Sequence, residues 1–149
     1  GGTSITARAI MGRFINSELP YQKHIYVGEE KETGIKRTTL ELVSPRKKVF
    51  NKPLVILVSN WTGSMGEGIA IGFDALKRGS IVGTKMAGLL GEIFTFETEE
   101  LKIPFSFPCV KLQTVNGIPR EQYVPKILVT DQSKSIEIAK GLIRKATNK

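Results

Sequence analysis

The sequence has little of several residue types, and each shortage excludes a class of protein. Its 149 residues include one cysteine and one histidine. Cys109 alone cannot form an internal disulfide, and no group of Cys, His, Asp and Glu has the spacing of a metal site. The longest apolar run is far too short to span a bilayer, and no signal peptide is visible. We therefore expect a globular domain with no metal, no cofactor and no integral membrane segment.

The formal net charge of +8 does not by itself indicate a nucleic-acid partner. A nucleic-acid footprint is a patch or stripe of basic residues, ideally with aromatic residues between them. Here the lysines and arginines are scattered among glutamates, namely Glu29, Glu30, Glu32, Glu97, Glu99 and Glu100. We therefore expect no nucleic-acid partner.

The chain opens with Gly1-Gly2 and enters a helical pattern almost at once, without a leading tail or a starting methionine. Thr3 or Ser4 can cap this first helix, which we expect to extend to about Ile15. Such a beginning is typical of a piece cut from a longer polypeptide, inside a domain rather than at its boundary. The length is still sufficient for one domain with its own core.

The stretch from Pro53 to Gly79 organises the rest of the chain. Leu54 to Val58 are five consecutive apolar residues, which predicts a strand covered on both faces. Apolar residues then recur at helical spacing after Ser64, and residues 81–83 read as a second buried strand. A strand, a helix and a strand in this order predict a parallel βαβ unit, with Ser64 where the first strand hands over to the helix. Ligands usually bind at that end of a strand in an α/β sheet.

Shorter patterns predict the other elements. Residues 24–27 and 38–43 read as a hairpin around a charged turn at 28–37. Two further strands are expected at 92–96 and 103–113, and the prolines at 104 and 108 indicate that the second is an edge strand or is bent. A last strand is expected at 127–129, followed by a helix from about 131 to 145. The apolar residues expected to face inward from this helix are Ile136, Ala139, Leu142 and Ile143.

Ser64 has a structural and a catalytic interpretation. Ser64-Met65-Gly66-Glu67 matches the capping box S-x-x-E, in which the serine only starts a helix. In the catalytic interpretation, the turn exposes the hydroxyl of Ser64, and the small residues Gly63 and Gly66 leave room for a substrate carbonyl. The amide of Met65, at the helix start, would then point to where an oxyanion develops. The two roles do not exclude each other.

Three parts of the chain resemble one enzyme family. VILVSNWTGSMGEGIAIGFDALKRGSIVGTKMAG, at 55–88, is similar to the nucleophile region of the carboxy-terminal processing peptidases and tricorn-protease cores. Gly1-Gly2-Thr3 resembles the end of that family's D-L-R-x-N-x-G-G motif, and GIPREQYVPKILV, at 117–129, resembles its E-x-x-G-V-x-P-D-I-x-V stretch. The resemblance implies an α/β fold of the ClpP/crotonase type, with a mostly parallel central sheet, flanking helices and an added β-hairpin. Residues 1–149 would form the C-terminal part of a peptidase catalytic domain.

The resemblance also implies the roles of individual residues. Ser64 matches the nucleophile, and Met65 would supply one oxyanion amide. Gly1 or Gly2 would supply the other, and we favour Gly2. The lysine that serves as general base in the processing peptidases is replaced by Leu89, which cannot take a proton. The closer match is then the tricorn-like branch, in which Glu121 corresponds to the catalytic glutamate, although an ordinary surface carboxylate is an equally good interpretation.

The general base is the missing part of this assignment. The family's histidine lies upstream of the D-L-R-x-N-x-G-G motif, before Gly1. We expect the one histidine here, His24, to be structural or exposed, with a role as base as the less favoured alternative. The resemblance thus implies an exported serine peptidase that acts on a protein or peptide and can form a homo-oligomer. A catalytically inactive binding or assembly module is the main alternative, and an acyl-CoA enzyme of the crotonase type is a weaker one.

Overall fold

A computed structural model describes residues 1–148 and shows two separate sheets. The larger sheet has the order β2-β1-β6-β5, and the smaller has the order β3-β4-β7. The bounds of their strands are β1 Leu19–Tyr26, β2 Thr38–Val43, β3 Val55–Val58, β4 Ser80–Gly83, β5 Gly91–Glu97, β6 Pro104–Gln113 and β7 Ile127–Leu128. The helices are α1 Ser4–Met11, α2 Val27–Thr33, α3 Met65–Ala75 and α4 Ser135–Thr147, with short 3₁₀ turns η1 Arg120–Gln122 and η2 Gln132–Lys134.

The predicted βαβ unit is present. β3 and β4 pair in parallel and α3 connects them, as the change from an apolar run to helical spacing indicates. The prediction that the first strand is covered on both faces is wrong, because β3 is an edge strand and Leu57 is 46% exposed. β4 is the central strand, and Ile81, Val82 and Gly83 are all buried.

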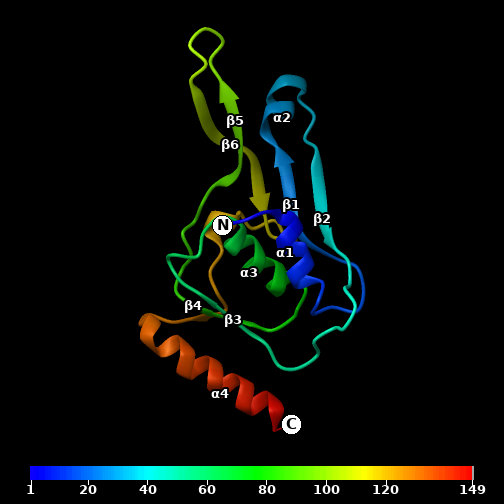
Figure 1. The fold of residues 1–149 in the computed structure, drawn as a ribbon, viewed down its shortest axis with the longest axis vertical. Coiled ribbons are helices and arrows are strands. Elements are labelled where there is room, and N and C mark those ends of the chain that lie inside the picture. The colour runs from blue at the N-terminus through cyan, green and yellow to red at the C-terminus, as the bar shows by residue number, and fades with distance from the viewer. Residues whose placement is uncertain (149) are drawn as a thin grey trace.

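The fold is α/β, as expected, but the predicted mostly parallel central sheet is wrong. All strand pairs of the larger sheet are antiparallel, and only the three-stranded sheet is parallel. β1 lies at the centre of the larger sheet, between β2 and β6. In Figure 1 the antiparallel sheet rises above α3, whereas the parallel sheet lies below it and α4 closes the lower end.

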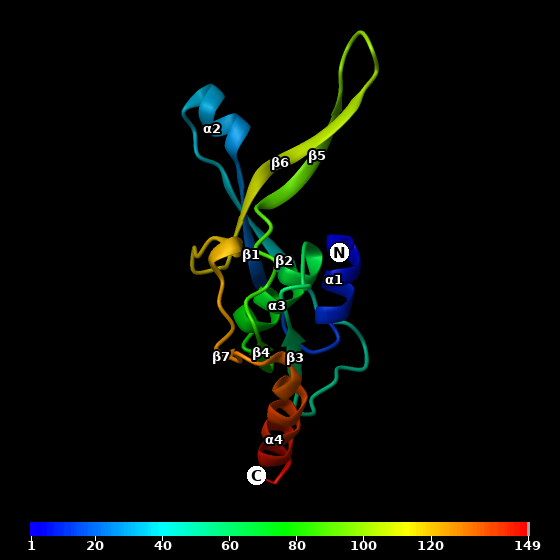
Figure 2. The ribbon, with the colours of Figure 1, turned by 90° about the vertical axis from the view of Figure 1, so that its left-hand side faces the viewer.

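Two projections extend from the antiparallel sheet (Figures 1 and 2). The first carries α2, which replaces the charged turn expected at 28–37 and ends at Gly34, where φ is 73°. The second is the β5–β6 ribbon. Pro104 and Pro108 lie in its two-stranded part, beyond the pairing of β6 with β1, and the register shifts between Glu92 and Ile93. β6 is therefore an inner strand where it pairs with β1, but an edge strand where the two prolines lie, and its pairing is irregular between these parts.

The core places α3 between α1 and β1. Gly72 of α3 allows this close approach, because a Cβ atom built there would lie 2.4 Å from the sulfur of Met11 and 3.2 Å from the ring of Tyr21. Both of these side chains are fully buried. Tight packing of two helices and a strand fixes the N-terminus of α3 beside the N-terminus of α1. The candidate site lies at this junction.

The last helix packs against the parallel sheet less completely than predicted. α4 contacts β3 and β4, and Ala139 is buried as expected. Ile136 and Ile143 are 55% and 40% exposed, so the prediction that they face inward is wrong. Within residues 1–148, no helix combines the length and the apolar character needed to cross a membrane.

Candidate active site

The turn before α3 holds Ser64 in a backbone conformation that serine rarely adopts. Its φ and ψ are 58° and −126°, whereas a helix N-cap residue is normally in the extended region. Such a conformation costs about 1–3 kcal/mol and persists only where the surroundings hold it. The same strained strand-to-helix turn presents the nucleophile of α/β-hydrolases. Ser64 is exposed at the head of the helix.

Glu67 holds this turn in place. Its side chain is completely buried and completes the capping-box pair with Ser64, as the S-x-x-E pattern predicts. The main-chain amide of Ser64 donates to Glu67 Oε2 at 2.8 Å. The amides of Gly88 and Leu89 donate to Glu67 Oε1 at 2.8 and 3.3 Å. One carboxylate therefore joins the start of α3 to the loop after β4.

Arg120 supplies a positive charge to this buried carboxylate. Its side chain is 3% exposed, and Nε lies 3.8 Å from Glu67 Oε2. The guanidinium also donates to the carbonyl of Leu89 from Nε and Nη2, at 3.1 and 2.8 Å. Burial lowers the pKa of Arg120, while Glu67 acts in the opposite direction. The sequence does not reveal this pair, because 53 positions separate Arg120 from Glu67 and no motif marks the pairing.

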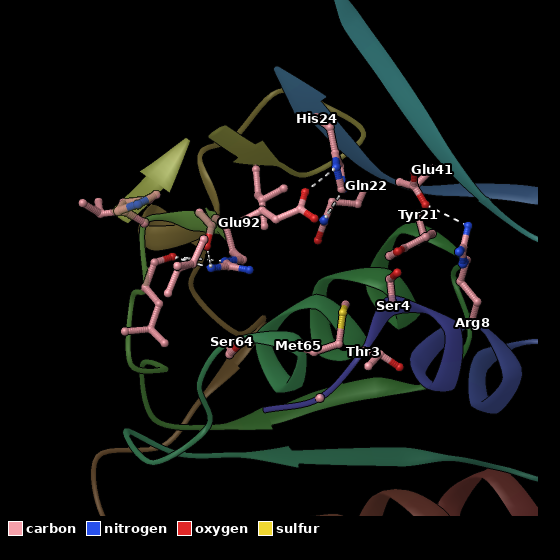
Figure 3. A pocket seen from close by; sticks show the side chains of 18 of the residues that line it. Thr3, Ser4, Arg8, Tyr21, Gln22, His24, Glu41, Ser64, Met65 and Glu92 are labelled. Carbon is pink, nitrogen blue, oxygen red and sulfur yellow. Dashed lines mark hydrogen bonds and ion pairs between the residues drawn. The ribbon is translucent and has the colours of Figure 1, made fainter. Parts of the chain in front are cut away.

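Ser64 lines a cavity of about 770 Å³ together with Met65 and Gly2. Figure 3 shows Ser64 and Met65 beside the start of α1, where Thr3 caps the helix. Neither the amide of Met65 nor that of Gly2 is hydrogen-bonded within residues 1–148. Two helix N-termini thus face one cavity, and each favours negative charge. The structure brings together three of the four residues that the sequence singles out.

Glu121, the fourth residue, does not line this cavity. It is exposed, belongs to η1 and borders a second cavity, which Leu90 also lines. The main chain of Glu121 lies beside Gly88, since a methyl group built on Gly88 would lie 3.6 Å from the carbonyl oxygen of Glu121. Its neighbour Arg120 fixes η1 to the Leu89 carbonyl, so the backbone of Glu121 has a defined place next to the loop that Glu67 binds.

Leu89 lies against Gly63, the residue before the candidate nucleophile. A Cβ atom built on Gly63 would lie 3.3 Å from Leu89 Cδ1, and Leu89 lines the same cavity as Ser64. The resemblance implies a lysine at this position, but Leu89 presents an apolar side chain to the turn before α3. Lys85 is exposed in the loop after β4.

His24 lines the cavity but is engaged by other side chains. Gln22 Nε2 lies 2.8 Å from His24 Nε2, and Glu92 Oε2 lies 3.6 Å from His24 Nδ1. Because an amide nitrogen only donates, His24 Nε2 is the acceptor and its proton sits on Nδ1, facing Glu92. Burial lowers the pKa of His24, which favours this neutral form. His24 is buried and structural here, as the favoured interpretation predicts.

Several solved structures share this fold at low sequence identity. Mature CPAF complexed with lactacystin is 14% identical, with a TM-score of 0.78 over 100% of this chain and 43% of its own. A putative peptidase from Parabacteroides merdae is 16% identical, with a TM-score of 0.71 over 99% and 47%. The photosystem II D1 C-terminal processing protease is 18% identical, with a TM-score of 0.64 over 96% and 36%. The chain thus spans less than half the length of each of these proteins.

Sequence comparisons identify the family. A search of curated proteins found no match. The resemblance to the carboxy-terminal processing peptidases is confirmed by a family model and by the fold of the processing protease above. The model describes peptidase family S41 and matches residues 1–103, more than half of the 149 residues, so this chain belongs to peptidase family S41.

Proposed function

We propose that this protein hydrolyses peptide bonds as a serine peptidase, with Ser64 as its nucleophile. The observation that carries the proposal is the strained, exposed position of Ser64 at the head of α3, φ 58° and ψ −126°, on the wall of a cavity. A residue that only capped the helix would gain nothing from positive φ. Membership of family S41 supports a serine peptidase in general.

The reaction that we propose begins with attack of Ser64 Oγ on the substrate carbonyl while a general base takes the hydroxyl proton. The carbonyl oxygen becomes negatively charged in the tetrahedral intermediate. The amides of Met65 and Gly2 would donate to it, since both line the cavity and both lack a partner within residues 1–148. The base then gives this proton to the leaving nitrogen as the intermediate collapses, and a water molecule, deprotonated by the same base, releases the acyl group from Ser64 as a carboxylic acid.

The general base, in this proposal, comes from outside the 149 residues. Leu89 occupies the place of the lysine base, and both nitrogens of His24 face other side chains. Glu121 would orient or support the incoming base. This role of Glu121 is supported by its exposed position on η1, because Arg120 anchors η1 to the loop beside Ser64. The finer likeness to the tricorn-like branch and to a ClpP/crotonase core, and export from the cell, belong to the same proposal.

The second candidate function is a peptidase-like module that binds peptides without cleaving them. The observation that favours it is the apolar Leu89 against Gly63, at the position of a catalytic lysine. In this case Ser64 would still line a cavity but would lack activation.

A fluorophosphonate probe on the full-length polypeptide separates the two functions, because it labels only activated serines. We expect labelling of the natural sequence and none of a Ser64→Ala variant, together with loss of peptide hydrolysis. Ser4→Ala is the matched control, since Ser4 lines the same cavity on α1. Labelling that survives Ser64→Ala, or no labelling of the natural protein, would refute the catalytic assignment.

A further inference from the structure

The wall of the cavity away from Ser64 carries several polar and charged side chains. Figure 3 shows Tyr21, Glu41 and Arg8 on one side of it, with Gln22 and His24 between them and the turn of Ser64. Tyr21 and Gln22 are 0% and 2% exposed. Buried polar side chains are normally hydrogen-bonded, and leaving one unpaired costs about 1–3 kcal/mol.

Two buried polar atoms of this wall have no partner within residues 1–148. They are the hydroxyl of Tyr21 and Oε1 of Gln22. Gln22 uses its amide nitrogen on His24, which leaves the oxygen as a free acceptor. Burial raises the pKa of Tyr21 to about 12, so the phenol stays neutral and can accept or donate. Gln22 Oε1 is therefore an acceptor that a hydrogen-bond donor in the cavity would satisfy.

The charges around the wall leave one carboxylate without a cation. Arg8 pairs with Glu41 at 2.9 Å, and Arg120 pairs with the buried Glu67. Glu92 has His24 as its partner within residues 1–148, and burial lowers the pKa of that imidazole, which disfavours its charged form. Glu92 belongs to β5 and lines the cavity with its side chain 47% exposed.

At His24, nearby carboxylates outweigh the two arginines that line the cavity. Burial has the largest effect on the pKa of His24 and lowers it. The carboxylates of Glu41 and Glu92 come next and raise this pKa. Their effect is stronger than that of the guanidinium groups of Arg120 and Arg8, which lower it. The part of the cavity around Glu92 and Gln22 therefore favours a group that carries positive charge and hydrogen-bond donors, whereas the helix N-termini at Ser64 and Gly2 favour negative charge.

We propose that this cavity is a specificity pocket for a basic side chain, lysine or arginine, of the peptide substrate. Glu92 acts as its counter-ion and Gln22 Oε1 as a further acceptor. Ser64 lines the same pocket, so a side chain bound there belongs to a residue close to the cleaved bond. The proposal rests on the proposed peptidase function, but the binding that it describes does not require catalysis.

Binding to the full-length Ser64→Ala variant tests the pocket without turnover. Two fluorescein-labelled peptides differ at one residue, which is lysine in the first and norleucine in the second, so the stem is kept and the ammonium group is removed. Fluorescence anisotropy should show about tenfold tighter binding of the lysine peptide, the discrimination that one charge-assisted hydrogen bond gives. Glu92→Gln should bring the ratio of the two affinities close to one by weakening only the lysine peptide.

Glu97→Gln is the matched control. Glu97 lies on the same strand, β5, and is similarly exposed, but it pairs with Lys102 on the ribbon and does not line the cavity. It should leave the ratio of the two affinities unchanged. Equal binding of the two peptides, no binding of either, or an equal effect of the two substitutions would overturn the proposal.

Fluorophosphonate labelling of the natural protein keeps this inference separate from the proposed function. Labelling of Ser64 without a preference for lysine would refute the pocket and leave the peptidase assignment standing. A lysine preference without labelling would refute catalysis and leave a binding site for basic peptides.

Discussion

The buried pair of Glu67 and Arg120 leads to an asymmetric prediction about stability. Glu67→Gln keeps the shape of the side chain, and its carbonyl can still accept from Gly88. Its new amide group, however, would meet the amide of Ser64, donor against donor, where Oε2 now accepts at 2.8 Å. Arg120 would also keep its charge in a 3% exposed position without a counter-ion. Removing one member of a buried pair in this way costs about 3–5 kcal/mol.

The converse substitution should cost less. In Arg120→Met, Glu67 keeps its three amide donors, which stabilise the carboxylate without a cation. The main loss is at the carbonyl of Leu89, which two guanidinium nitrogens now contact, and an unmade buried hydrogen bond costs about 1–3 kcal/mol. We therefore expect Arg120→Met to be less destabilising than Glu67→Gln by roughly 2 kcal/mol, the difference between these two ranges.

Urea unfolding of both single variants and of the double variant measures these losses of stability. The shift in the midpoint, multiplied by the common slope, gives the change in the free energy of unfolding. Lys140→Met is the control, because it removes an ion pair at the surface. The side chains of Lys140 and its partner Glu137 are 54% and 72% exposed, and such pairs contribute less than about 1 kcal/mol to stability. An Arg120→Met variant that loses as much stability as Glu67→Gln, or a Glu67→Gln variant that behaves like Lys140→Met, would refute the view that main-chain amides hold the carboxylate.

Two further predictions concern strain and pH. Ser64→Gly should stabilise the fold by about 1 kcal/mol in urea unfolding, because glycine adopts φ 58° freely, whereas loss of an ordinary cap would destabilise it. The pKa of His24 is lowered by burial, so below its ordinary value of 6.5 the unfolded chain binds a proton that the folded chain does not. The free energy of unfolding should then fall as the pH drops from 7 toward 5, and His24→Asn should flatten that part of the pH profile; a profile unchanged by the substitution would contradict this.

The sequence predicted those parts of the fold that depend on neighbouring residues. The run Leu54 to Val58, the helical spacing after Ser64 and the S-x-x-E pattern together specify β3, α3 and the capping pair, and all three are present. α2 was missed because its residues, VGEEKET, have no apolar periodicity and none of them is buried.

The arrangement of the sheets could not be read in the same way. The central strand β1 pairs with β6, so that Lys23 lies opposite Gln113, and nothing local in either segment specifies that partner. The polar wall of the cavity has the same origin, since Gln22, Glu41 and Glu92 come from three different strands. Charge and hydrogen-bonding requirements of this kind arise only after long-range pairing has brought the strands together.

The two interpretations of Ser64 become one when the atoms are assigned. The main-chain amide of Ser64 donates the hydrogen bond to Glu67, so this bond fixes the turn through the backbone. A capping box that acts through the backbone can hold a non-glycine residue at positive φ, because the buried carboxylate is in turn tied to Gly88, Leu89 and Arg120. The stability of that network offsets the strain at Ser64. The S-x-x-E pattern therefore starts the helix and, in the same contacts, presents the serine to the cavity.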